Sequence, residues 1–318
     1  MSNASNPGNP RSSHWAQQRE TTFVAGIWLL YGVYRLTGRW LFRLCMAPVV
    51  LVHWLARPAL RQASLQYLKR LHATHTVFAK PPGAWQSLRH VALFADTMLD
   101  KLLVMGGRYA AENVHEYGYE PVRQARQSGQ GGIFVTAHMG CLELCRVMSA
   151  HESTFRLNVL VHTQHAQAFN RILQRLNPQA HVNLIEVTDM GVPLAMMLAE
   201  KVAAGEFIAI AGDRVPVRQS KTVTVDFLGH PAPLPVGPYV LASLLKCPLY
   251  LLGCMHEGRG YAVHFERLAE RVELPRATRQ AALQAHAQQF ADAVAALLCR
   301  SPYDWFNFFP FWDQAHAD

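Results

Sequence analysis

The stretch Gly132-Ile-Phe-Val-Thr-Ala-His-Met-Gly-Cys-Leu-Glu-Leu-Cys145 decides which fold this chain is expected to adopt. It begins as a short apolar run of the kind that forms a buried strand, and a polar turn and the start of a helix follow. His138 stands just past the strand, and Glu143 follows five residues later. Because ligands collect at the carboxyl ends of strands in a helix-covered sheet, this turn is the first candidate for a functional site.

The spacing of His138 and Glu143 limits how the two side chains can meet. Five residues of a regular helix would turn them roughly 140° apart. A break at Met139-Gly140, where glycine supplies backbone freedom, would bring them together. Glu143 would then orient the imidazole, and the other ring nitrogen would be free to take a proton as a general base. Plainer roles also fit: a carboxylate near a helix N-terminus is favourable, and the histidine would suit a turn.

Cysteine chemistry offers two other interpretations of this turn. Cys141 beside His138 would suit the thiolate nucleophile of a thioesterase or hydrolase. His138, Cys141 and Cys145 are also three potential metal ligands, although the paired spacing and the fourth ligand of a zinc module are missing. The six cysteines stand in mostly apolar surroundings, which indicates buried free thiols rather than a disulfide framework. We therefore expect no metal and no cofactor.

Short strand-like and longer helix-like segments alternate after Gly106-Gly107. This alternation predicts an α/β fold with a mixed, mostly parallel sheet flanked by helices. The expected strands are 133–137, 157–161, 182–187, 207–211, 223–227, 248–253 and 261–267. The expected helices are 141–151, 165–176, 191–204, 237–246 and 278–299, preceded by helices at 59–78 and 87–105.

Two further places carry charge where a ligand would be expected. Asp213 and Arg214 follow the apolar run 207–211, so they too stand at the end of a predicted strand. An arginine there can bind a phosphate or stabilise an oxyanion, and an internal salt bridge is the plainer alternative. Asn170 and Arg171 lie on the helix predicted after the strand 157–161. The Pro/Gly-rich stretch 228–238 is expected to form a stiff loop that would suit the wall of a cleft.

Basic residues are concentrated near the N-terminus. Nine of the 30 Lys and Arg lie between Thr21 and Ala95, where no Asp or Glu occurs. The rest of the chain carries 21 basic and 22 acidic residues, so the formal charge of +8 belongs to this N-terminal quarter. Such a distribution favours contact with an anionic surface.

The same quarter contains two apolar runs, Phe23–Tyr34 and Leu44–Leu55, each shorter than the about 20 residues of a spanning helix. Arg35, Arg39 and Arg43 separate the runs at intervals of four, which places them in one stripe on a helix. We interpret the region as an amphipathic helix in a membrane interface, held by apolar burial and anionic headgroups. A single span with tolerated arginines and a helix docked on the core are the alternatives. No cleavage site typical of a signal peptide follows.

Taken together, these stretches resemble the bacterial late lipid A biosynthesis acyltransferases, a branch of the lysophospholipid acyltransferase superfamily. The motifs that carry the resemblance run in order along nearly the whole chain, and their combination is more specific than any one of them. They are Leu36-Thr-Gly-Arg39, Tyr67-Leu-Lys-Arg70, Phe94-Ala-Asp-Thr-Met-Leu-Asp-Lys101, His138-Met-Gly-Cys-Leu-Glu143, Gly212-Asp-Arg214, Phe227-Leu-Gly-His-Pro-Ala232 and Pro302-Tyr-Asp-Trp-Phe-Asn-Phe-Phe309.

The resemblance implies a glycerolipid acyltransferase-like fold and transfer of a fatty acyl chain from acyl carrier protein to a hydroxyl of a lipid or glycolipid. By position, His138 would be the general base and Glu143 its orienting partner. Asn170, Arg171, Asp213 and Arg214 would hold the acceptor, the donor's phosphopantetheine or the geometry of the site. The thioester is already activated, so Cys141 is expected to be dispensable. No nucleic-acid partner is expected.

The implied organisation is a flexible segment at 1–20, basic membrane-associating helices at 21–78 and an acyltransferase domain at 79–318. The implied location is the cytoplasmic face of a bacterial inner membrane, reached through an interfacial or single-span N-terminal helix. Two departures from the family pattern concern the acceptor. The turn has Met139 and Cys141-Leu142 where an aromatic and an Asn-Trp pair are usual. The closing aromatic block is more similar to relatives found with aryl-polyene lipid clusters.

The closing block, Tyr303–Trp312, holds seven aromatic residues in ten positions. Packing against the core would remove this large apolar ring surface from water. The functional alternative is a wall of an acyl tunnel or a patch that faces the membrane. A different class of function also fits the whole chain, namely a non-catalytic lipid-binding or scaffold protein of the same fold.

Overall fold

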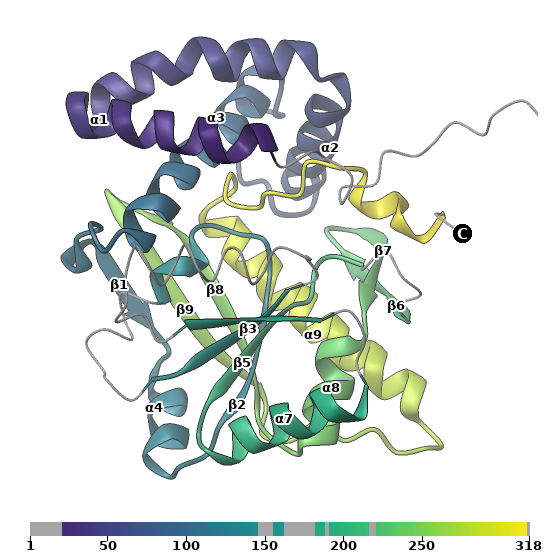
Figure 1. The fold of residues 1–318 in the computed structure, drawn as a ribbon. Helices are drawn as coiled ribbons and strands as arrows, with labels where there is room; N and C mark the ends of the chain where they lie inside the picture. Colours follow the sequence, from purple (N-terminus) through teal and green to yellow (C-terminus); the bar gives the residue numbers. More distant parts are fainter. Residues whose placement is uncertain (1–20, 146–154, 162–181, 188–190, 216–220, 317–318) are drawn as a thin grey trace, which may run out of the picture.

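The computed structural model describes residues 21–145, 155–161, 182–187, 191–215 and 221–316. Figure 1 shows a layer of three N-terminal helices over one end of an α/β body, with the closing segment of the chain passing between layer and body. The fold prediction is confirmed, because the body is built on a mostly parallel sheet flanked by helices.

The central sheet has seven strands in the order β1-β9-β8-β2-β5-β3-β4. All neighbouring strands run parallel except β8 and β9, which pair antiparallel. The order places β2, the strand of the His138 turn, in the middle of the sheet between β8 and β5. The strands are β1 (Val114–Tyr117), β2 (Gly132–Thr136), β3 (Leu157–Val161), β4 (Val182–Glu186), β5 (Phe207–Ala211), β8 (Leu249–Glu257) and β9 (Gly260–Ala269).

Helices cover both faces of this sheet because its central strands are apolar on both sides. Ile133 and Val135 of β2 join one core with α7 (Val192–Ala203), α8 (Gly237–Leu245) and α9 (Arg279–Arg300). Phe134 points the other way, into an aromatic core capped by α4 (Glu120–Gln127). A central strand buried on both faces is typical of a parallel sheet.

The N-terminal layer consists of α1 (Thr21–Ala56), α2 (Pro58–His75) and α3 (Ala84–Met105). Gly38 divides α1, because its backbone (φ 74°, ψ −179°) leaves the helical region for one that favours glycine. After this kink, Phe42 packs on Leu99 and Leu103 of α3. The second half of α1 is therefore attached to the layer along one side.

The arginine stripe of α1 was predicted to face anionic headgroups, but in the structure Arg39 and Arg43 face α3. Arg39 forms a salt bridge with the buried Asp100, and Arg43 binds Asp96 with an Nε–Oδ2 distance of 3.0 Å. The two aspartates are four residues apart on α3, as the two arginines are on α1. Each pair therefore lies on one face of its helix, and the two faces meet. The side chain of Arg35 lies outside the described residues. For this face of α1, the alternative of a docked helix describes the structure, with α3 as the surface on which it docks.

Most other predicted segments lie within a few residues of the observed ones, with three exceptions. The Pro/Gly-rich stretch after β6 (Thr222–Phe227) forms a strand, β7 (His230–Pro235), and the two make a separate antiparallel hairpin. The helix expected from residue 141 begins as a single 3-10 turn, η3 (Leu142–Leu144), and residues 146–154 lie outside the described part. The helix expected at 165–176 lies outside it too. Two short 3-10 turns complete the fold, η2 (Ala111–Asn113) and η4 (Phe311–His316).

The closing aromatic segment is largely buried. Trp305 is fully enclosed, and Phe311 and Trp312 belong to the same core as the sheet and α9. Tyr67 of α2 packs on Trp305 with ring centroids 4.9 Å apart, which joins the helical layer to the body. Burial therefore accounts for these three rings.

Candidate active site

The turn after β2 places His138 at the carboxyl end of the central strand. Gly140 breaks the path as predicted, with φ 51°, and the backbone of β8 lies so close that a Cβ there would stand 2.2 Å from the Cys254 carbonyl oxygen. Only glycine fits this position without a shift of backbone. The turn can therefore lie flat against β8 and hold the imidazole at the end of the sheet.

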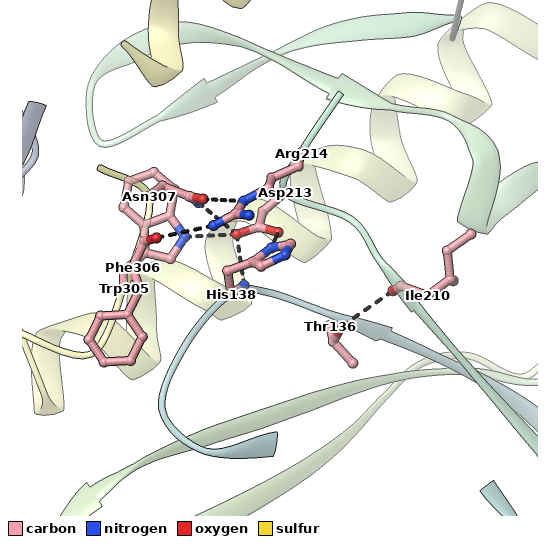
Figure 2. Close-up of polar contacts among 8 residues, drawn as sticks. All are labelled: Thr136, His138, Ile210, Asp213, Arg214, Trp305, Phe306 and Asn307. Atoms are coloured by element: carbon pink, nitrogen blue, oxygen red, sulfur yellow. Dashed lines mark hydrogen bonds and ion pairs between the residues drawn. The ribbon is translucent and has the colours of Figure 1, made fainter. Parts of the chain in front are cut away.

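Asp213 is the residue that binds His138. Strands β2 and β5 pair in parallel with Thr136 opposite Ala211, so His138 and Asp213 leave the sheet side by side, each two residues later. The Oδ1 atom of Asp213 lies 2.7 Å from Nδ1 of His138, and its Oδ2 atom accepts the backbone N–H of His138 at 2.8 Å (Figure 2). One carboxylate thus fixes both the ring and the backbone of the histidine.

Two side chains of the closing segment complete the shell around Asp213. Trp305 donates its Nε1–H to Oδ2 at 3.0 Å, and Asn307 donates its amide to the same oxygen at 2.8 Å (Figure 2). Burial alone would raise the pKa of the Asp213 carboxyl. The charge and hydrogen bonds of His138, together with the charge of Arg214, outweigh burial and hold that pKa far below its usual range. Asp213 is therefore ionised.

The protonation state of His138 follows from that ionised partner. A carboxylate only accepts hydrogen bonds, so Nδ1 carries the proton and Nε2 presents a lone pair. Burial lowers the pKa of His138 below its usual 6.5, and Asp213 opposes that shift. The ring still has an open edge, because 35% of the side chain is exposed. A neutral, oriented and reachable imidazole is the arrangement that a general base requires.

Glu143 does not take the orienting role predicted for it. The 3-10 turn η3 directs its carboxylate toward α3, where it pairs with Lys101 at 3.2 Å, and the Cys141 thiol lies 3.7 Å from it. Burial acts to lower the pKa of Lys101, but the Glu143 carboxylate and other nearby groups together outweigh it, so that pKa is raised. Glu143 therefore fixes α3 to the turn, while Asp213 occupies the nitrogen that it was expected to bind.

The thiols of the turn are poor nucleophiles. Burial raises the pKa of Cys141 well above its usual value and that of Cys145 to about 12, so both are protonated at neutral pH. Protonated thiols are also weak metal ligands. Within the described ranges, no three or more His, Cys, Asp or Glu side chains are grouped to hold a metal ion.

Arg214 binds the same closing segment that supplies the donors to Asp213. Its Nε donates to the Asn307 side-chain oxygen at 2.7 Å, and its guanidinium binds the Phe306 carbonyl at 3.1 Å (Figure 2). Arg214 thus braces the segment that itself contacts Asp213. Asn170 and Arg171, the other predicted binding residues, lie outside the described residues.

Trp305 and Asn307 were not among the predicted site residues. The aromatic content of their stretch predicts burial but does not predict a role for its polar members. The available signal was an Asp, a Trp and an Asn within four positions of one another, Asp304 to Asn307, in an otherwise apolar segment. Polar groups that recur in a buried run need partners, and here those partners are Asp213 and the His138 turn.

A comparison of the whole chain with known families bears on this geometry. The family model for bacterial lipid A biosynthesis acyltransferases matches residues 75–314. The chain belongs to that family. The match covers every residue of the site, from Lys101 to Asn307, and it confirms the resemblance carried by the motifs.

A curated relative points in the same direction. A phosphatidylinositol mannoside acyltransferase from Mycolicibacterium smegmatis is 24% identical to the chain over 200 residues. The aligned part is 59% of this chain and 59% of the relative, so the likeness spans little more than half of either protein.

Proposed function

We propose that the protein is a membrane-associated acyltransferase that moves a fatty acyl chain from an acyl carrier protein thioester to a hydroxyl of a lipid or glycolipid. The observation that carries the proposal is the His138–Asp213 pair at the ends of the two central parallel strands, in a chain of the lipid A acyltransferase family. A base at this position suits a reaction whose difficult step is activation of a hydroxyl.

The proposed reaction uses one proton carrier. The Nε2 atom of His138 takes the proton of the acceptor hydroxyl while its oxygen attacks the carbonyl carbon of the thioester. The tetrahedral intermediate collapses, the C–S bond breaks, and the leaving thiolate takes the proton back from the imidazolium. Asp213 stabilises that imidazolium and keeps the ring in one tautomer. No covalent acyl-enzyme is required, because a thioester is an activated donor.

The outer face of α1 supports contact with the membrane. The segment Gly38–Ala56 is 19 residues long with a mean hydropathy of 1.3, long and apolar enough to cross a membrane by length and composition. Trp40, Leu44 and Val52 on it are 75%, 57% and 64% exposed. Because the opposite face binds α3 through its arginines, we propose that the helix lies in the interface with this apolar face in lipid, on the cytoplasmic side where acyl carrier protein is found.

The basic side chains that are not paired within α1 and α3 suit an acidic donor protein. Arg57, Lys69 and Lys80 are exposed on the helical layer, in the part of the chain without acidic residues before Asp96. We propose that this layer receives acyl carrier protein, since complementary charge speeds such encounters. The similarity of the closing block to relatives from aryl-polyene clusters makes lipids of that class the first acceptors to test.

The test is acyl transfer from labelled acyl carrier protein to bacterial membrane lipids, followed by mass spectrometry of the lipids. His138→Ala should lose transfer by at least about 10³-fold while folding and binding vesicles normally. The matched control, His230→Ala, changes an exposed histidine on β7 and should keep wild-type activity. Full activity of His138→Ala would refute the mechanism. Lipid retention without transfer to any acceptor would indicate a binding protein, and loss of activity in Cys141→Ser would indicate thiol chemistry.

A further inference from the structure

A second histidine–aspartate pair repeats the geometry of the first. Asp304 accepts the backbone N–H of His256 at 2.7 Å and lies 2.7 Å from its ring Nδ1. The carboxylate is completely buried, and the ring is only partly exposed. His256 stands in β8, the neighbour of β2, so both pairs belong to adjacent central strands. Nothing in the proposed chemistry uses this second pair.

Asp304 is held at more points than a simple ion pair would need. The Ser301 hydroxyl donates to its Oδ2 atom at 2.5 Å, in addition to the two contacts from His256. The His256 ring rests on Tyr261 with centroids 4.2 Å apart, and the Tyr261 hydroxyl in turn donates to Asp100 of α3. Position 304 is thus one of the best-fixed points in the closing segment.

From that fixed point the next three residues reach the site; we name residues 304–307 the closing strap. The Asp304 carbonyl accepts the Gly140 N–H at 3.0 Å, and the Phe306 N–H donates to the His138 carbonyl at 2.8 Å. Trp305 and Asn307 then donate to Asp213. Every residue of the strap therefore contacts either the His138 turn or the carboxylate that orients it.

We propose that His256 and Asp304 form a positioning pair, which sets the register of the closing strap and thereby aims Trp305 and Asn307 at Asp213. The proposal rests on the proposed function in one respect, namely that His138 is the base. His256 acts through Asp304 and touches no reacting atom, and its role is to supply a donor at the position of Nδ1.

Loss of the His256 donor should change the protonation of His138, although the two side chains are not in contact. A strap out of register withdraws hydrogen bonds from Asp213, and a carboxylate with fewer donors is more basic. A more basic partner favours the imidazolium, so His138 should hold its proton to higher pH. The charged groups that face His138 are Asp213 and Arg214 after β5 and Lys101 of α3, and a change at His256 leaves all three in place.

The experiment compares His256→Leu with His256→Asn in the full-length protein. Leucine removes the donor, whereas the asparagine amide nitrogen is attached at the same carbon as Nδ1 and can still donate to Asp304. His286→Leu is the matched control, because it removes a partly buried histidine that stacks on Tyr239 from α9, away from the strap. Two measurements are made at a series of pH values: kcat and KM for acyl transfer, and the rate at which diethyl pyrocarbonate modifies His138, followed by mass spectrometry.

For His256→Leu we expect kcat to fall by roughly tenfold at nearly unchanged KM, with the midpoint of His138 modification displaced to higher pH. His256→Asn and His286→Leu should match the wild type. An unchanged midpoint and kcat in His256→Leu would overturn the proposal, as would an asparagine variant as impaired as the leucine one, since that result would assign ring chemistry to His256.

Two additions keep the test decisive. Should His256→Leu fail to fold, Ser301→Ala removes a single contact to Asp304, and it should move the same two readouts in the same direction by less. Modification of His138 needs no substrate. If the wild type transfers no acyl chain, the proposed function fails while the modification data still decide whether the pair positions His138.

Discussion

The α/β body and helix α1 distribute their side chains in opposite ways. In the body, apolar side chains fill both faces of the sheet, and the buried Asp213 carboxylate at a strand end is hydrogen-bonded to His138. In the second half of α1, Arg39 and Arg43 bind α3 and Phe42 packs against it, whereas other large apolar side chains, among them Trp40, Leu44 and Val52, are exposed. A protein surrounded only by water does not gain from this arrangement. This contrast supports the proposal that the outer face of α1 contacts lipid, whereas the body is packed as in other proteins surrounded by water.

The largest effect is expected where the body concentrates its buried charge. In Asp213→Asn the amide can donate to Nδ1, which places the imidazole proton on Nε2 and removes the lone pair that takes the hydroxyl proton. We expect kcat to fall by about 10³-fold, equivalent to about 4 kcal/mol in the barrier. Steady-state acyl transfer measures this, with the exposed Asp226→Asn as control.

Glu143→Gln sharpens the same test, because it removes the carboxylate first expected to orient His138 and leaves Asp213 untouched. It should keep kcat within about tenfold of the wild type, since the change weakens the contacts of Glu143 with Lys101 and Cys141 and leaves His138 and Asp213 in place. A variant as inactive as Asp213→Asn would restore Glu143 to the catalytic role.

The junction of the two regions should give the next largest effect. Asp100→Ala leaves the partly buried Arg39 guanidinium without its ion partner and the Tyr261 hydroxyl without its acceptor. We expect the free energy of unfolding to fall by about 3 kcal/mol. Asp96→Ala, four residues away on the same helix, breaks only the exposed pair with Arg43 and should cost less than about 1 kcal/mol. Urea unfolding in mild detergent compares them, and equal losses would contradict the contrast.

A buried histidine between layer and body should make stability depend on pH. His90 is fully enclosed, bound to Ser64 and to the Trp305 carbonyl, and burial lowers its pKa to about 4. Below pH 6.5 the unfolded chain takes up a proton that the folded chain refuses until about pH 4. Stability is thus complete above pH 6.5 and falls by about 3 kcal/mol down to pH 4. His90→Gln, which can still donate to the carbonyl, should show a shallower decline in urea unfolding, and an equally steep one would contradict this origin.

The smallest effect concerns the outer face of α1. Leu44→Ser or Val52→Ser removes apolar surface from the proposed lipid contact, and each should weaken vesicle binding by about 1 kcal/mol, or roughly fivefold. Leu244→Ser is the matched control, because Leu244 is equally exposed but lies on α8 in the body. Sedimentation with vesicles of bacterial lipids measures the binding. Equal effects at Leu44 and Leu244 would remove the distinction between the two surfaces.

The regular parts of the body were predictable because their signals are local. The strand before His138, the turn at Gly140 and the strand before Asp213 all follow from short apolar runs and one glycine. The partner of His138 was not predictable in this way. Asp213 meets it only because β5 lies beside β2 in the sheet with Thr136 opposite Ala211, and strand order is a long-range property that spacing along the chain does not contain.

Long-range contacts also explain why the direction of the arginine stripe and the role of Trp305 and Asn307 were not predicted. The stripe of Arg39 and Arg43 was visible in the sequence, but its direction depends on Asp96 and Asp100 of α3, about 55 residues further on. Trp305 and Asn307 reach Asp213 from about 90 residues away, after the whole of α9 has been laid on the sheet. The spacing of residues along a helix predicts that they share a face, but it does not predict which element packs against that face.

The position of the closing strap in the chain has a consequence for biosynthesis. Ribosomes add about 5–20 residues per second, so α1 leaves the ribosome tens of seconds before residues 304–307 do. During that interval the nascent chain already carries α1, the helix for which we propose lipid contact, while Asp213 still lacks the donors from Trp305 and Asn307. With α1 in the proposed interfacial role, the order of synthesis allows membrane contact to form first and completes the His138 centre last.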